Sequence, residues 1–201
     1  WPCLWNSKYQ GKLLMFDNPR DAFAIAESML GYSFNTEDEQ ELKNCADLLA
    51  TQSPVLQGYV MDQIFDRMER GEAWAAPYYA GDYLTMVEEN PDLGFSHPKE
   101  GFNIFIDAMC IPKGCQNKEG AEAFTNFLCR PEISAANLDY IGYSTPETAA
   151  KDYLDEDVTS SPVSYPDDET LARSESFAEL GVGATQTMND LWLSVKTSTS
   201  N

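Results

Sequence analysis

Histidine is nearly absent from this sequence, and the motifs of common enzyme classes are missing from it. The one histidine, His97, lies in a Ser-His-Pro turn, where a surface position is expected. There is no phosphate-binding loop, no dinucleotide-binding glycine motif and no serine-nucleophile motif. Two carboxylates can hydrolyse glycosides, but among 33 acidic residues no pair is distinctive. We therefore expect a protein that is not an enzyme and that uses no cofactor.

Cysteine is present, but not in a metal-binding arrangement. Cys3, Cys45, Cys110, Cys115 and Cys129 form no Cys-x-x-Cys pair, and one histidine cannot complete a zinc site. Cys110 and Cys115 could form a disulfide if the chain between them turns back. Cys45 and Cys129 fall on apolar helix positions, where a thiol behaves as a small buried hydrophobe. Free thiols and no metal site are expected.

Basic residues are scarce. The sequence has 13 Lys and Arg against 33 Asp and Glu, a formal net charge of -20. Nucleic-acid binding needs clustered Lys and Arg, so nucleic acid is not expected as a partner. A negative field attracts cations, but an acidic surface also keeps a protein soluble. The charge therefore permits a cationic ligand without predicting one.

Long hydrophobic runs are also missing. No stretch approaches the roughly 18 apolar residues of a membrane-spanning helix. The sequence opens with Trp1-Pro2-Cys3, without an initiator Met or a secretory signal, so we read it as the interior of a longer precursor. Its 201 residues, 43% of them hydrophobic, suffice for one substantial domain or two small lobes.

Capping residues and apolar periodicity predict several helices. For the helix over 22–30, Asn18 is the cap, Pro19 takes the first position and Gly31 is the stop. Asn117 and Pro131 begin two others in the same way, and Thr36 with Glu39 forms a capping box. The further helices are expected at 36–50, 60–70, 83–89, 118–129 and 131–140, from Thr145 onward, and at 183–195.

Strands are predicted between these helices. Residues 73–79 read as a buried strand that runs into a loop, 93–96 as a brief strand, and 103–111 as the clearest strand. Residues 155–166 read as an extended loop. Strands separated by helices indicate an α/β fold, and the turn region 90–101 is the best internal boundary.

Carboxylates lie beside aromatic residues at the ends of these elements. Phe105 and Asp107 are two residues apart and would point to the same side of the predicted strand. An aromatic face with a carboxylate suits an alkylammonium ligand, although Asp107 could equally accept hydrogen bonds at a strand end. Asn18 and Asp21 have a sufficient structural role as cap and first-turn acid, and tyrosines such as Tyr79 often only complete a core.

An ordered series of motifs covers nearly the whole chain. The series comprises Leu4 to Leu13, Asp17 to Phe23, Leu30 to Ser33 with Asn35-Thr36, Ile111-Pro112, Asn117 to Ala121, Asn126 to Leu128, Arg130 to Glu132, Ile141 to Tyr143, Thr145-Pro146 and Tyr165 to Asp167. This ordered set resembles the spermidine/putrescine-binding proteins of polyamine ABC importers. The resemblance implies the type 2 periplasmic-binding-protein fold, with two α/β lobes that close on a ligand. It also implies that the chain begins after the first crossover. Residues 1–98 would then form most of the second lobe, and 99–201 the returning part of the first.

The same resemblance implies a binding site. The acidic pair of the family falls on Asn18 and Asp21, where Asn18 is an amide in place of a carboxylate. The stacking ring falls on Tyr79 and the aromatic-x-Asp pair on Phe105 and Asp107, with Tyr and Phe in place of Trp. A polar contact near the C-terminus falls on Ala178 or Glu179.

These residues imply capture of a polyamine, spermidine or putrescine, for the permease subunits of an ABC importer. The expected location is extracytoplasmic, in the periplasm or at the cell surface, with a membrane-anchored lipoprotein as the full-length form. Two alternatives remain. The scaffold could bind another small solute, such as a different amine or a metal, because three site positions are substituted. A truncated domain could also bind nothing and self-associate through unpaired strand edges.

Overall fold

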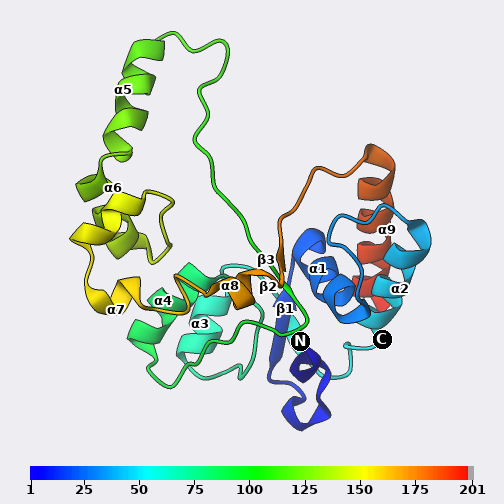
Figure 1. Cartoon of the computed structure of the whole chain (residues 1–201). Helices are drawn as coiled ribbons and strands as arrows, with labels where there is room; N and C mark the ends of the chain where they lie inside the picture. The colour runs from blue at the N-terminus through cyan, green and yellow to red at the C-terminus, as the bar shows by residue number, and fades with distance from the viewer. Residues whose placement is uncertain (199–201) are drawn as a thin grey trace. The chain divides into compact units, whose positions relative to one another are not determined.

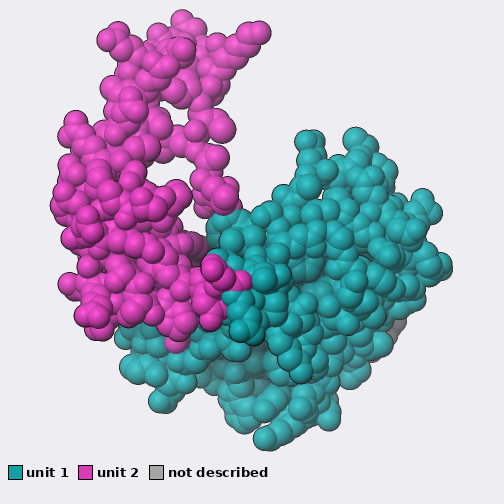
Figure 2. All heavy atoms as spheres, in the orientation of Figure 1, with its two compact units in different colours: residues 1–78, 86–105, 169–201 teal, residues 79–85, 106–168 magenta. Residues whose placement is uncertain are grey.

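The computed structural model describes residues 1–198 and divides the chain into two compact units (Figures 1 and 2). The first unit comprises residues 1–78, 86–105 and the C-terminal part from Glu169, and the second comprises 79–85 and 106–168. Each unit is a compact part of this chain alone. The assignment of 1–98 and 99–201 to two lobes of a larger protein therefore stays a prediction.

A pair of parallel strands forms the centre of the first unit. β1 (Leu13–Phe16) pairs with β2 (Leu56–Val60), so that Met15 lies opposite Tyr59. All four β1 residues are buried. Neither strand was predicted from the sequence. β1 is a short continuous apolar run, which carries no period-two alternation, and β2 contains Gln57 and Gly58. The parallel pairing needs the helical crossover that the chain supplies between the two strands.

Helix α1 (Pro19–Leu30) follows β1 as predicted. The Asn18 side chain accepts a hydrogen bond from the Arg20 backbone N–H at 2.9 Å, and Gly31 ends the helix with a φ of 75°. Every residue from 21 to 28 is buried, so α1 is covered on all sides. Two further helices lie against it: α2 (Glu39–Ala50) and α9 (Val182–Ser198), which also pack on each other.

Two helices of the first unit differ from their predicted bounds. The cap of α2 is Asp38, whose carboxylate accepts from the backbone N–H of Gln40 and Glu41, and not Thr36. Residues 56–60 form a strand, so α3 covers only Ile64–Glu69. Two short 3-10 helices, η1 (Pro2–Trp5) and η2 (Ser7–Tyr9), precede β1.

Helices α5 (Lys118–Leu128) and α6 (Pro131–Ile141) dominate the second unit and confirm the predicted starts at Asn117 and Pro131. The helix expected from Thr145 is a 3-10 helix, η3 (Thr148–Tyr153), and the expected loop 155–166 contains α7 (Glu156–Thr159). Helix α4 (Ala80–Glu89) confirms the prediction at 83–89 and has residues in both units. Helix α8 (Asp168–Leu171) leads back into the first unit.

The predicted strand 103–111 is wrong for most of its length. Only Phe102–Asn103 forms a strand, β3, which pairs in parallel with β4 (Ser174–Glu175). Residues 104–110 are exposed, and Ile106 retains 84% of its surface. A strand needs a neighbour for its backbone N–H and C=O groups, and no described strand lies beside 105–111. Residues 93–96 form no strand, and within 73–79 only Ala75 makes an isolated bridge, to Leu13.

All five cysteines are free, as expected, so Cys110 and Cys115 do not form a disulfide. Cys45 is buried on α2, and burial raises the pKa of its thiol to about 12. The expectation that Cys129 is buried is wrong. Cys129 follows α5, a helix with no buried residue, and its thiol is exposed.

Candidate functional site

The six predicted site residues belong to both units. Four lie in the first unit and two in the second: Asn18, Asp21, Phe105 and Glu179, and Tyr79 and Asp107.

The first turn of α1 carries two of these residues. Asn18 is half-buried and its side-chain oxygen caps the helix, which is the structural role anticipated for it. Asp21 is only 8% exposed. A carboxylate in the first helical turn is favoured by the helix dipole. Just before the cap, the Asp17 carboxylate is paired with the Lys196 ammonium of α9.

Arg20, which lies between Asn18 and Asp21, was not predicted from the sequence as a functional residue. Its Nη2 donates to Asn35 Oδ1 at 2.8 Å and to the Ala178 carbonyl at 3.1 Å. The guanidinium also lies over the Phe177 ring, 4.6 Å from its centroid. Burial lowers the pKa of Arg20, and the nearby acidic groups oppose that shift. A basic residue between two candidate ligand residues was the available signal.

Arg20 is one of several anchors of residues 174–181, which we call the 174–181 strap. Asn35 Oδ1 accepts from the Ala178 N–H at 2.7 Å, and Asn35 Nδ2 donates to the Ser176 carbonyl at 2.9 Å. Farther along, the Gly181 N–H donates to Glu37 at 2.7 Å. The strap is therefore fixed against the loop between α1 and α2 at three successive points.

Glu175 is the second residue of the strap, and its carboxylate accepts three hydrogen bonds. Its carboxylate accepts from the Ser33 hydroxyl, the Phe34 N–H and the Asn35 side chain, at 2.5 to 2.9 Å. Burial alone would raise the pKa of Glu175, but these donors favour the ionised form and the net pKa is lowered. Glu175 is thus an anion stabilised by its hydrogen-bond donors.

Glu27 contrasts with Glu175. It is fully buried on α1, and neither carboxylate oxygen has a hydrogen-bond partner among the described residues. Burial raises the pKa of Glu27 to about 8; Arg20 opposes the shift, and Glu175 and Glu41 reinforce it. The carboxyl group is therefore mostly protonated at neutral pH. The signal in the sequence was one acidic residue in the run 22–30, whose other members are apolar except Ser28.

Glu179 and Phe105 are the exposed members of the first unit's set. Glu179 lies in the strap, directly after Ala178, whose N–H and C=O are already used by Asn35 and Arg20. Glu179 is exposed, and its contact with a ligand stays a prediction. Phe105 retains 42% of its surface.

The second unit contributes Tyr79 and Asp107. Tyr79 is half-buried and precedes α4, where its carbonyl accepts from the Tyr83 N–H at 3.1 Å. Asp107 is exposed in the extended segment after β3. Because that segment is not a strand here, the expectation that Phe105 and Asp107 share one side of a strand is not met.

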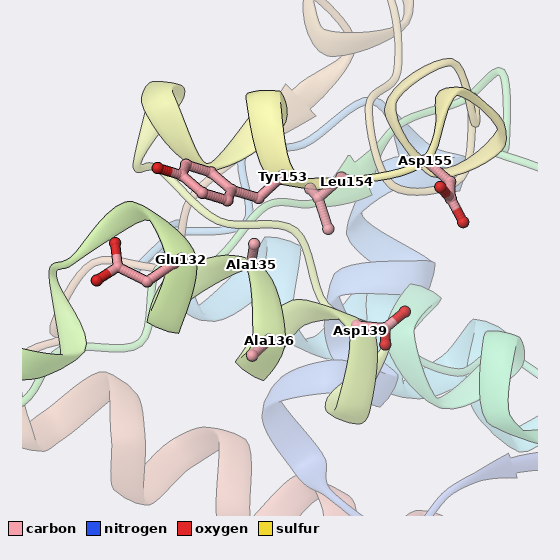
Figure 3. Close-up of a pocket in the computed structure, with 7 residues that line it drawn as sticks. All are labelled: Glu132, Ala135, Ala136, Asp139, Tyr153, Leu154 and Asp155. Carbon is pink, nitrogen blue, oxygen red and sulfur yellow. The ribbon is translucent and has the colours of Figure 1, made fainter.

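An acidic hollow of about 290 Å³ lies in the second unit between α6 and the chain after η3 (Figure 3). Three exposed carboxylates, Glu132, Asp139 and Asp155, line it with Tyr153. Figure 3 shows the Glu132 carboxylate pointing away from the other two. None of the six predicted residues lines this hollow.

Among residues 1–198, no three His, Cys, Asp or Glu side chains are grouped so that they could hold a metal ion. In the same part of the chain, no helix combines the length and apolar character that crossing a bilayer requires.

Comparison with known proteins places the chain among binding proteins. Residues 1–172 match the family described as bacterial extracellular solute-binding protein. The spermidine/putrescine-binding periplasmic protein of Escherichia coli K12 is 32% identical over 184 residues, which is 92% of this chain and 53% of that protein. The putrescine-binding periplasmic protein SpuD of Pseudomonas aeruginosa is 29% identical over 186 residues, 90% of this chain and 51% of that protein.

Solved structures agree with the sequence matches. The spermidine/putrescine substrate-binding protein PotD of Streptococcus pneumoniae, in complex with calcium and HEPES, matches with a TM-score of 0.90 and 32% identity. The match covers 100% of this chain and 62% of that one. The TpPotD lipoprotein of Treponema pallidum matches with a TM-score of 0.86 and 26% identity, over 97% of this chain and 60% of that one. The chain spans about half the length of the curated binding proteins of Escherichia coli and Pseudomonas aeruginosa that it matches.

Proposed function

Because this chain belongs to the bacterial extracellular solute-binding proteins, we propose that it is part of a protein that binds a polyamine, spermidine or putrescine, for uptake by an ABC importer. The observation that carries the proposal is the 32% identity to a spermidine/putrescine-binding protein over 92% of the chain. The type 2 binding-protein fold accounts for the match to PotD. The family is one of binding proteins, so we assign the chain no reaction.

The proposed ligand contacts combine ion pairs with aromatic surface. Asp21 and Asp107 pair with ammonium groups, and Tyr79 and Phe105 contact the methylene chain. Asn18 accepts a hydrogen bond where a carboxylate would form an ion pair. The net charge of -20 adds a long-range attraction for a polycation.

The family is extracytoplasmic, and we propose a location in the periplasm or at the cell surface. We also propose that the full-length protein is a membrane-anchored lipoprotein. One similar structure is a lipoprotein, which supports the anchor. Permease subunits of an importer are the proposed protein partners.

Calorimetric titration of the full-length protein with spermidine and putrescine tests the function. Asp21→Asn and Asp107→Asn each remove one charge-assisted contact, so each is expected to weaken binding about tenfold to hundredfold. Asp47→Asn and Asp152→Asn change exposed carboxylates, one in each unit, and are expected to leave the affinity unchanged. Absence of binding heat with both amines, in a folded sample, would overturn the proposal.

A related candidate is a different ligand on the same scaffold. The amide at Asn18, in place of a carboxylate, and the rings at Tyr79 and Phe105, smaller than Trp, favour this candidate. A thermal-shift screen across diamines, triamines, amino acids and divalent metals distinguishes a polyamine from another ligand. A larger shift with a ligand outside the polyamines would assign the site to that ligand.

Self-association of this chain is a second candidate, favoured by the apolar side chains that the second unit exposes. Ile106, Met109, Phe124, Phe127 and Tyr140 each retain at least 40% of their surface. Exposed apolar groups on this scale favour burial against another surface, and we take a second copy of the chain as that surface. Light scattering checks this: a concentration-independent monomer contradicts self-association.

A further inference from the structure

We propose that Arg20 is a positioning residue of the amine site: it holds the 174–181 strap, and with it Glu179, beside the first turn of α1. That turn carries Asn18 and Asp21. The inference rests on the polyamine function proposed above and assigns a role to a residue outside the set of ligand contacts.

The geometry places Arg20 between the two parts that it joins. Its backbone N–H donates to the Asn18 side chain, and its guanidinium donates to the Ala178 carbonyl. One residue thus connects the helix cap to the residue directly before Glu179. Asn35 completes the connection, because its side-chain oxygen accepts from both Arg20 and the Ala178 N–H.

The surroundings of Arg20 favour a fixed guanidinium. Phe177 of the strap lies under it, and the side chain is half-buried, with a buried Nη1 that has no partner among the described residues. The Asp21 and Glu175 carboxylates add an attractive field. A partly desolvated guanidinium is costly unless its donors are used. Here one nitrogen, Nη2, donates both hydrogen bonds, to the Asn35 side chain and to the Ala178 carbonyl of the strap.

The charge of Arg20 and its proposed positioning role predict opposite changes in ligand affinity when Arg20 is replaced. By charge alone, removing a cation next to Asp21 would strengthen the binding of another cation. If Arg20 positions Glu179, its removal releases the strap and weakens binding. The direction of the change in affinity therefore separates the two roles.

The experiment compares Arg20→Met, Arg20→Lys and Glu179→Gln in the full-length protein, with spermidine and putrescine as titrants. Arg20→Met is expected to weaken binding about tenfold, the size of one charge-assisted hydrogen bond, and to speed hydrogen exchange at the Ala178 and Gly181 amides. Arg20→Lys retains one donor and is expected to recover part of the affinity. In the Arg20→Met background, Glu179→Gln is expected to have less than about half its effect on the logarithm of the affinity.

Arg70→Met is the matched control, because Arg70 is an exposed arginine of the same unit whose side chain pairs with the exposed Asp66. If Arg20→Met does not fold, Asn35→Ala breaks the same connection from the other side and carries the same expectations. Tighter binding, or an unchanged affinity with an unchanged exchange rate at Ala178, overturns the positioning role. A wild-type protein that binds neither amine overturns the proposed function instead.

Discussion

The two units of the chain bury their side chains to very different extents. In the first unit all of β1 and residues 21–28 of α1 are buried. In the second unit, helix α5 has no buried residue, and the buried apolar side chains among 79–85 and 106–168 are Ala135, Leu138 and Ala150. Burial of apolar surface is the main stabilising contribution to a fold. The first unit therefore has a core of its own, and the second has little of one.

The difference shows that local signals and tertiary packing act separately in this chain. Helix α5 has a capping residue and an i,i+4 ion pair between Lys118 and Glu122. Its 11 residues are nevertheless fewer than an isolated helix needs for stability in water, about 12 to 15. The apolar side chains Phe124 and Phe127 remain exposed. The second unit is thus the part that gains most from an additional surface.

A pair of phenylalanine truncations gives the largest expected contrast. Phe23→Ala removes a side chain that is 0% exposed, and it is expected to lower the free energy of unfolding by about 3–5 kcal/mol. Phe124→Ala removes a ring that is 56% exposed, and a change within about 0.5 kcal/mol is expected. Urea unfolding followed by circular dichroism measures both. Equal losses would show that the Phe124 ring is buried in the folded protein.

The buried carboxyl of Glu27 gives the next largest effect. Its pKa is raised from 4.5 to about 8, so this group stabilises the fold fully below pH 4.5, and the contribution is lost as the pH rises through 8. Between pH 5 and 8 the free energy of unfolding is expected to fall by roughly 1.4 kcal/mol per pH unit from this group. Glu27→Gln cannot ionise and is expected to remove that slope.

Glu119→Gln is the control for Glu27, because it changes an exposed carboxylate on α5 of the second unit. Urea unfolding at several pH values compares the three proteins. The same slope in the wild type and in Glu27→Gln would contradict an ionisable, dry Glu27.

Sequence predicted the elements whose signals are local. Asn18, Pro19 and Gly31 bound α1, and Asn117 and Pro131 begin α5 and α6, because caps and fixed backbone angles act within one turn. The strands were not predictable in the same way. β1 was missed because a buried apolar run has no periodicity, and 103–111 was overextended because a strand exists only where another strand pairs with it.

The same distinction between local signals and tertiary contacts applies to the candidate site. Asn18 and Asp21 could be placed on the first turn of α1 because their positions follow from the cap. The hydrogen bonds that join Arg20 and Asn35 to Glu175 and Ala178 could not be predicted from the sequence, since they connect residues 140 to 158 positions apart. Contacts of that range depend on the tertiary fold.

The smallest expected change in the free energy of unfolding comes from removing a helix cap in each unit. Asp38 caps α2 with two hydrogen bonds, and Asn117 caps α5 with one. Asp38→Ala is expected to lower the free energy of unfolding by about 1 kcal/mol, because α2 is packed in the core of the first unit. Asn117→Ala weakens α5 by a similar amount locally, but α5 buries no side chain that would couple this loss to global unfolding.

Hydrogen exchange and urea unfolding of the two cap variants separate local from global loss. For Asn117→Ala, the expected result is faster exchange of the amides of residues 120–128 with an unchanged urea midpoint. For Asp38→Ala, the midpoint itself is expected to decrease. A midpoint that decreases equally in both variants would show that α5 unfolds together with the first unit, and the contrast between the two units would then be one of exposure and not of stability.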